Sequence, residues 1–331
     1  MGGSHWSTDA YEEAELLRKK AGKSAFAYSD SARATGKWTV HPTLDPKGVT
    51  FRESRDSDEH PRSNAIAVFF DETGSMKQIP HVFQKKLAEL MSLLLVKGYI
   101  QDPQILFGAF GDAVWDRVPL QVGQFESGVE MDEHLRNVIL EGNGGGGGNE
   151  SYELPLYFLA RHTSIDCWEK RGRKGYAFLI GDEKAYAAVN KEQVAKLIGD
   201  DLPESIPLRQ VIAEVQRSYH LFFIFPSNGS YAADGEHPAF WKDLLGQNVI
   251  ILEDENAVSE TIALTIGLTE KAVDLAEGKE DLSSAGASAG AIDAAARALQ
   301  VYASAASISS VAGVALPGMD PSTGSGGTER L

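Results

Sequence analysis

The sequence NAIAVFFDETGSM, residues 64–76, places a run of apolar and small residues directly before an acidic turn. Residues 65–70 have the length and composition of a buried β-strand. Asp71, Thr73 and Ser75 then carry oxygen at alternate positions, and Gly74 allows the backbone to turn tightly. A hard cation such as Mg²⁺ takes oxygen ligands and commonly keeps some waters, so one carboxylate and two hydroxyls suit it. The stretch therefore predicts a strand that ends at a cation site.

The composition of the 331-residue chain limits the classes of partner. With 43% hydrophobic residues the chain is expected to be globular, as one large domain with appendages or as two small domains. Its formal net charge of −16 argues against nucleic acid and anionic membrane surfaces as partners, and it suits a protein that binds cations.

The single cysteine, Cys167, excludes an internal disulfide framework. Residues 1–6 lack the basic and apolar regions of a signal peptide, so we expect a cytoplasmic protein. The uncharged stretch at residues 298–319 consists mostly of Ala, Ser and Gly, which favours a weak helix or a tail over a membrane span.

The chain divides into three parts by composition. Residues 1–62 form an N-terminal extension of mixed charge, in which a short helix is expected over residues 11–21. Residues 63–275 carry the alternating strands and helices of the main domain. Residues 276–331 form an Ala/Ser/Gly-rich tail, expected to be helical over residues 292–303 and then disordered.

Apolar runs alternate with amphipathic stretches throughout the main domain. Strands are predicted over residues 65–70, 105–110, 117–122, 176–180, 221–225 and 249–252, and helices over residues 80–97, 131–139, 151–161, 191–198, 208–219 and 259–275. Such an order predicts an α/β fold with a doubly wound, mostly parallel, Rossmann-like sheet and helices on both faces. The second and third strands are joined as a hairpin, which adds one antiparallel edge strand.

Oxygen-bearing residues follow three of these segments. Besides the turn at Asp71, Glu150 comes between Asn149 and Ser151 at the end of a glycine loop, and Asp182 follows the fourth strand. Because ligands of open α/β sheets bind outside the carboxyl ends of the strands, we expect these segments to meet there.

This set of residues resembles the metal-ion-dependent adhesion site of von Willebrand factor A domains, whose signature is Asp-x-Ser/Thr-x-Ser followed by two later ligands. The order of elements over residues 64–275 is similar as well, and the stand-alone type found in bacteria and phages is the one implied. The second loop departs from the commonest pattern, a threonine after paired glycines, and looks like the subset that uses a glutamate. The resemblance implies Mg²⁺, with Mn²⁺ or Ca²⁺ as substitutes, and the ligands Asp71, Thr73, Ser75, Glu150 and Asp182, with Asn149 and Ser151 as alternatives in the second loop.

The resemblance also implies a function in binding. In the family, an acidic side chain of a protein partner fills an open coordination position of the metal ion. Stand-alone domains of this type often work beside MoxR-type AAA+ ATPases as metal-dependent adaptors, so such an ATPase is an expected partner. No activated nucleophile and base stand near these residues in the order that hydrolysis needs, which favours binding over catalysis.

Other interpretations of the same residues stay open. Asp, Thr and Ser are also favoured in turns and helix caps. Residues 69–75 additionally resemble the phosphorylated-aspartate motif of haloacid-dehalogenase-type phosphohydrolases, with Asp71 as nucleophile and Mg²⁺ between Asp71 and Asp182. Thr73 stands where such a phosphatase carries its acid/base aspartate, and Tyr186 where it carries a further acid. A structural subunit of an assembly is the remaining class.

Three features near the predicted site receive simpler interpretations. Asp112 and Asp116, in the hairpin turn, are expected to be solvated acids. The glycine run at residues 144–148 lacks the Gly-Lys-Ser/Thr of a phosphate loop and is expected to be a flexible lid. Trp115 is expected to be a packing residue.

Overall fold

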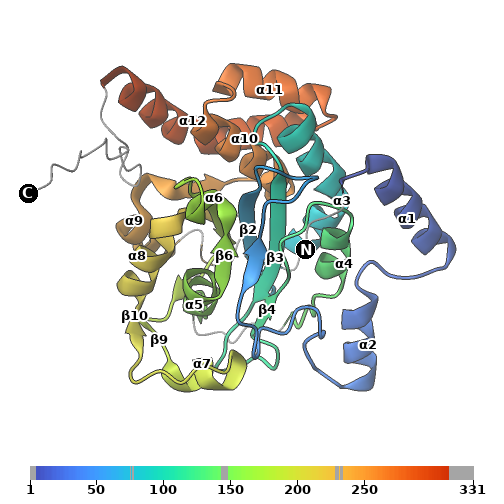
Figure 1. Cartoon of the computed structure of the whole chain (residues 1–331), viewed down its shortest axis with the longest axis vertical. Helices are drawn as coiled ribbons and strands as arrows, with labels where there is room; N and C mark the ends of the chain where they lie inside the picture. Colours follow the sequence, from blue (N-terminus) through green and yellow to red (C-terminus); the bar gives the residue numbers. More distant parts are fainter. Residues whose placement is uncertain are drawn as a thin grey trace, which may run out of the picture.

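A six-stranded sheet forms the centre of the computed structural model (Figure 1). Its strand order is β12-β11-β7-β2-β3-β4. The structure describes residues 5–74, 76, 78–142, 148–227, 231 and 234–312, with side chains to residue 304 in the last helix. The strands are β2 (Asn64–Asp71), β3 (Pro103–Phe110), β4 (Leu120–Val122), β7 (Gly175–Ile180), β11 (Tyr219–Pro226) and β12 (Val249–Leu252). Every neighbouring pair is parallel except β3 and β4. The predicted mostly parallel sheet with one antiparallel edge is therefore confirmed.

Both faces of the sheet are buried. Along β2, Ile66, Val68 and Phe70 contribute to one hydrophobic core, and Ala67 and Phe69 contribute to the other. Alternate residues of a strand point to opposite faces, so an unbroken apolar run is what a strand covered on both sides requires.

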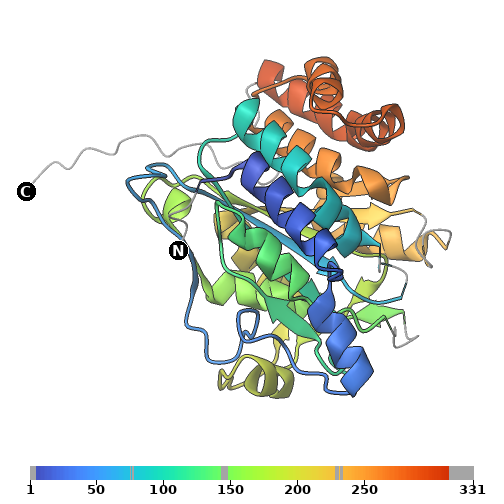
Figure 2. The ribbon, with the colours of Figure 1, turned by 90° about the vertical axis from the view of Figure 1, so that its right-hand side faces the viewer.

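Helices cover the sheet on each side. The core with Ile66 is closed by α1 (Thr8–Lys20), α3 (Ile79–Met91), α4 (Glu130–Arg136), α10 (Val258–Glu270), α11 (Leu275–Ser284) and α12 (Ala289–Ala312). The opposite core is closed by α5 (Glu153–Arg161), α6 (Asp166–Glu169), α7 (Lys191–Leu197), α8 (Leu208–Ser218) and α9 (Glu236–Leu245). Figure 2 shows α1 lying along α3, where Tyr11 donates a hydrogen bond to the carbonyl of Gln84. The fold is thus a mixed α/β sandwich with helices on both faces.

Short elements complete the chain. They are α2 (Ala27–Thr35), β1 (Arg52–Ser54), η1 (Ser92–Val96), β5 (Asn149–Glu150), β6 (Thr163–Ile165), β8 (Lys184–Ala185), β9 (Ala188–Val189), β10 (Ile206–Pro207), η2 (Gly246–Asn248) and η3 (Glu255–Ala257). The pair β5 and β8 matters for the site, because it joins two loops at the carboxyl edge of the sheet.

The N-terminal extension is tied to the main sheet. Strand β1 pairs in parallel with β6, and Arg52 donates from Nη2 to the carbonyl oxygens of Thr43 and Val122, at 3.0 and 2.9 Å. Leu44 is wholly buried in the core on the α3 side, and its carbonyl accepts a hydrogen bond from Val122. The extension therefore contributes side chains to the core of the domain.

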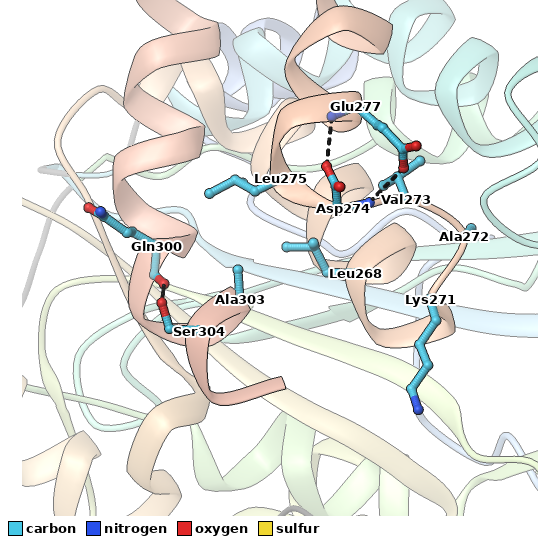
Figure 3. A pocket seen from close by; sticks show the side chains of 10 residues that line it. All are labelled: Leu268, Lys271, Ala272, Val273, Asp274, Leu275, Glu277, Gln300, Ala303 and Ser304. Carbon is cyan, nitrogen blue, oxygen red and sulfur yellow. Dashed lines mark hydrogen bonds between the residues drawn. The ribbon is translucent and has the colours of Figure 1, made fainter. Parts of the chain in front are cut away.

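The helix predicted over residues 259–275 ends earlier than expected. Lys271 adopts a left-handed conformation, with φ of 58°, and stops α10. Asp274 then caps α11 through a capping box with Glu277, in which each side chain accepts a hydrogen bond from the backbone of the other (Figure 3). A non-glycine residue rarely takes positive φ, so the sequence carried no usual stop signal at this position.

A pocket of about 650 Å³ lies between the end of α10, the start of α11 and α12 (Figure 3). Leu268, Lys271, Leu275 and Ala303 are among the residues that line it, and none of its lining residues belongs to the predicted cation site. In the described part of the chain no helix is long and apolar enough to cross a membrane. The predicted disordered end, residues 317–331, lies outside the described residues.

Candidate metal centre

Two of the predicted ligands leave the sheet side by side. Strand β2 ends at Asp71, and β7 ends two residues before Asp182. These strands are parallel neighbours, with Phe70 opposite Ile180, so both carboxylates come to the same edge of the sheet. Burial, the largest cause, together with the charges of Asp182 and Glu183, raises the pKa of Asp71 to about 8.

Asp71 is wholly buried, and only one of its oxygens has a partner among the described atoms. Oδ1 accepts a hydrogen bond from the backbone N–H of Thr73 at 2.7 Å, which is the local turn that the capping interpretation requires. Oδ2 has no hydrogen-bond partner. Thr73 is buried beside it, and Ser75 lies outside the described residues. A turn alone therefore accounts for Oδ1 of Asp71 but gives the buried Oδ2 no hydrogen-bond partner.

Glu150 reaches the same place from β5. Its strand pairs in parallel with β8, which begins two residues after Asp182, and Glu150 is opposite Ala185. The side chain is wholly buried, and neither carboxylate oxygen has a partner among the described atoms. Burial, then the charges of Asp71 and Glu183, raise the pKa of Glu150 to about 11. The structure thus brings Asp71 close enough to both Asp182 and Glu150 for their charges to interact.

The alternative ligands of the second loop, Asn149 and Ser151, already form hydrogen bonds within the protein. Asn149 donates from Nδ2 to the carbonyl of Ala185 at 3.1 Å, which fastens β5 to β8. The hydroxyl of Ser151 accepts a hydrogen bond from the backbone N–H of Ala113 at 2.9 Å. Both side chains hold loops together, which leaves Glu150 as the second-loop residue with unused oxygen atoms.

Further carboxylates surround this group, and the sequence interpretation of them was partly wrong. Asp112 was expected to be solvated but is wholly buried, where it accepts hydrogen bonds from the hydroxyl of Tyr186 at 2.9 and 3.1 Å. Asp116 is half-buried, and burial followed by the charges of Glu141 and Asp112 raises its pKa to about 6. Glu183, which sequence reasoning did not single out, has a pKa raised to about 7 by burial and by the charge of Asp182.

Tyr152 lies beneath the site and was not identified from the sequence. It is wholly buried, its ring packs against Phe110 and Trp241 at centroid distances of 4.6 and 5.0 Å, and its hydroxyl accepts a hydrogen bond from the N–H of Glu183. A side chain at Gly181 would overlap the Tyr152 hydroxyl, so this glycine allows the strand end and the ring to approach closely. The only sign of Tyr152 in the sequence was an aromatic residue two positions after Glu150. This spacing does not distinguish a residue that supports a site from one that only packs in the core.

The glycine run predicted to be a lid falls at residues 144–147 outside the described residues. Gly148, its last member, is held by His237, whose Nε2 lies 3.2 Å from the Gly148 carbonyl oxygen while Nδ1 lies 2.6 Å from Oδ2 of Asp234. Tyr231 stacks on the His237 ring at 4.3 Å. One end of the glycine loop is therefore fixed to the start of α9.

Basic side chains do not balance these carboxylates in the described part of the chain. No ion pair there joins Asp71, Glu150 or Glu183 to a lysine or arginine, and Lys184, the next residue along, pairs with Glu236 instead at 3.0 Å. An unpaired buried carboxylate is costly, and a hard cation satisfies it through the same oxygens. The donor set therefore suits a divalent cation.

Asp, Glu, His and Cys side chains alone do not form a metal-binding group of three or more within the described ranges. The predicted set relies in addition on the hydroxyls of Thr73 and Ser75, and Ser75 is not among the described residues.

No family model and no curated protein matches the sequence. Among solved structures, the chain is similar to the pilus adhesin SpaC from Lactobacillus rhamnosus GG in its open conformation, at 9% identity over 65% of this chain and 31% of that chain, with a TM-score of 0.43. It is also similar to proximal thread matrix protein 1 from the mussel byssus, at 12% identity over 62% of this chain and 47% of that chain, with a TM-score of 0.40. The chain spans less than half the length of either protein.

Proposed function

We propose that this chain is a von Willebrand A-type domain that binds a protein partner through a divalent cation held by Asp71, Thr73, Ser75, Glu150 and Asp182. The observation that carries the proposal is the pair Asp71 and Glu150, wholly buried carboxylates with oxygen atoms that lack partners. Mg²⁺ is the proposed cation, with Mn²⁺ and Ca²⁺ as substitutes, because all three prefer oxygen ligands.

The residues of the chain have separate tasks in this proposal. The carboxylates of Asp71, Glu150 and Asp182 supply the negative charge that holds the cation, and Thr73 adds a hydroxyl. Tyr152 holds the end of β7 in place below them. When bound, the cation would leave one coordination position open, and an acidic side chain of the partner would fill it. A MoxR-type AAA+ ATPase belongs to this proposal as a candidate partner.

A phosphohydrolase is the less favoured function. Thr73 cannot act as the acid/base that such a reaction needs next to Asp71. A test substrate such as p-nitrophenyl phosphate is expected to remain intact in the presence of Mg²⁺. Turnover that Asp71→Asn abolishes would favour the phosphohydrolase over the binding domain.

Thermal and urea unfolding with Mg²⁺ or EDTA test the cation site. At one hundred times its dissociation constant, Mg²⁺ should raise the free energy of unfolding by about 2.7 kcal/mol, because it binds only the folded chain. Asp71→Ala and Glu150→Gln should each abolish this gain.

Glu153→Gln is the matched control, since Glu153 is a wholly buried carboxylic acid in the next helix, outside the proposed ligand set. The control should keep the response to Mg²⁺. A wild-type protein whose unfolding does not respond to Mg²⁺, Mn²⁺ or Ca²⁺ would rule the cation site out.

A further inference from the structure

The turn between β3 and β4 exposes two apolar side chains next to the candidate metal centre. Val114 is 55% exposed and Trp115 is 67% exposed, the second being the most exposed aromatic residue of the described chain. Trp115 was expected to be a packing residue, and that expectation is wrong. An exposed tryptophan beside a binding site is typical of residues that dominate the energy of protein interfaces.

The exposure of Trp115 does not come from a loose loop. The backbone N–H of Trp115 donates to the carbonyl of Asp112 at 3.1 Å, and the backbone N–H of Val114 donates to Oδ1 of Asp112 at 2.8 Å. Asp112 is in turn held by the hydroxyl of Tyr186, just after β8. The Ser151 hydroxyl accepts from the residue before Val114, which joins the turn to the second loop. The backbone that carries Trp115 is thus fastened to both other loops of the site.

The charge around this turn restricts what can pack on it. Asp112 and Asp116 belong to the turn itself, where the backbone N–H of Asp112 donates to Oδ2 of Asp116 at 2.6 Å. Glu150 and Glu183 lie in the two loops to which the turn is fastened. One divalent cation leaves part of this negative charge unbalanced, and the whole chain carries −16. A partner can therefore offer one carboxylate to the cation, but a second acid nearby would be repelled, whereas a basic side chain would be attracted.

We propose that Val114 and Trp115 form the second contact of the partner-binding surface, an inference that rests on the proposed cation site. The partner is a protein segment that presents one acidic side chain to the cation and a lysine or arginine to Trp115. The aliphatic part of that basic side chain covers the indole ring and Val114, while its charged group lies over the ring and toward Asp116.

A peptide library supplies the test, because the natural partner need not be known. Random heptapeptides displayed on phage are selected on the full chain in Mg²⁺ and eluted with EDTA. Eluted sequences should contain an aspartate or glutamate with a lysine or arginine close by. Synthetic copies should bind Trp115→Ala about tenfold more weakly than wild type, whereas the gain in stability with Mg²⁺ stays the same.

Trp168→Ala is the matched control, since Trp168 is also an exposed tryptophan, at 39%, and belongs to α6 rather than to the site. It should bind the peptides as wild type does. Replacing the basic residue of a peptide by alanine should weaken binding to wild type about tenfold and have little further effect on Trp115→Ala, because the two changes remove the same contact.

Three results would overturn the inference and say which part is wrong. Equal binding of the eluted peptides to wild type and Trp115→Ala removes the second contact and leaves the cation site standing. Eluted peptides without basic residues refute the stated partner chemistry. If EDTA elutes no peptides and Mg²⁺ does not stabilise the protein, the proposed function fails and this contact fails with it.

Discussion

Gly181 shows how closely single residues are fitted at the edge of the sheet. A β-carbon there would overlap the hydroxyl of Tyr152, whose ring is enclosed by Phe110, Phe223 and Trp241. Because these neighbouring rings restrict the movement of the Tyr152 ring, we expect an added methyl group to displace the strand end that carries Asp182.

Gly181→Ala should therefore lower the free energy of unfolding by about 1–3 kcal/mol, as overpacking of a dense core does. Adding Tyr152→Phe should restore part of this loss, since it removes the atom of closest approach. Urea denaturation gives both values.

Gly290→Ala is the control for this pair of variants, because Gly290 lies in α12 with nothing within 4 Å of an added β-carbon. It should change stability by less than about 1 kcal/mol, in the direction of stabilisation. A cost at position 181 no larger than at position 290 would contradict the close fit.

At the same scale, the sequence predicted some site residues and missed others for a physical reason. Asp71 and Asp182 directly follow apolar strands, so their place at the sheet edge could be deduced from local pattern. Asp112 could not be placed in this way, because its burial depends on Tyr186, just after the strand β8 that pairs with β5, and these segments are distant in sequence from the hairpin. Long-range pairing of short segments leaves no periodic signal.

At the scale of elements, the contact between α3 and α10 contains a group of buried charges. Lys86 of α3 forms an ion pair with Glu260, which is wholly buried in the first turn of α10. Glu89, one turn further along α3, has its pKa raised to about 7, by burial first and then by the charge of Glu260. One lysine thus faces two carboxyl groups between these helices.

This arrangement predicts a pH dependence of stability. Because the folded pKa of Glu89 is above the unfolded value of 4.5, the folded state holds a proton that the unfolded state releases. The stability that comes from Glu89 is complete below pH 4.5 and is lost as the pH rises through about 7. Glu89→Gln should reduce the fall in unfolding free energy between pH 5 and pH 8 by an amount on the order of 1 kcal/mol, after allowance for solvent screening.

Urea denaturation at several pH values measures the effect. Glu12→Gln, an exposed position on α1, serves as the control and should leave the pH profile as it is. Identical profiles for wild type and Glu89→Gln would show that Lys86 already keeps both acids ionised.

Helices and strands differed in how well the sequence predicted them. Strand β12 was predicted at Val249–Leu252 with its observed bounds, and the helix expected over residues 11–21 is α1, Thr8–Lys20. Helices α2, α6, α9 and α11 were missed. In the case of α11 the capping pair Asp274 and Glu277 was present in the sequence, but the left-handed turn at Lys271 that separates it from α10 was not predictable.

At the scale of the whole molecule, the core includes residues from the N-terminal extension. Tyr11, Phe26 and Leu44 are buried with the face of the sheet that carries Ile66 and Phe70. The composition of residues 1–62 gave no sign of this, because three apolar side chains are scattered along a polar segment. Their burial depends on the side chains of the main domain against which they pack.

Leu44→Ala should accordingly lower the free energy of unfolding by about 2–5 kcal/mol, the usual cost of emptying a buried leucine site. Leu17→Ala is the matched control within the same extension, since Leu17 is 59% exposed, and its effect should stay within about 0.5 kcal/mol. Equal effects of the two variants would mean that the extension only lies on the surface of the domain.

Trp241 gives the molecule an internal optical probe. Its indole N–H donates to the carbonyl of Glu183 at 2.8 Å, and its ring stacks on Phe223 at 3.9 Å within the core. Indole emission responds to the field and the hydrogen bond at its nitrogen, so the spectrum of this one residue depends on the position of the backbone between Asp182 and β8. In a variant that keeps only Trp241 of the five tryptophans of the chain, fluorescence can therefore report on events at the carboxyl edge of the sheet without an attached dye.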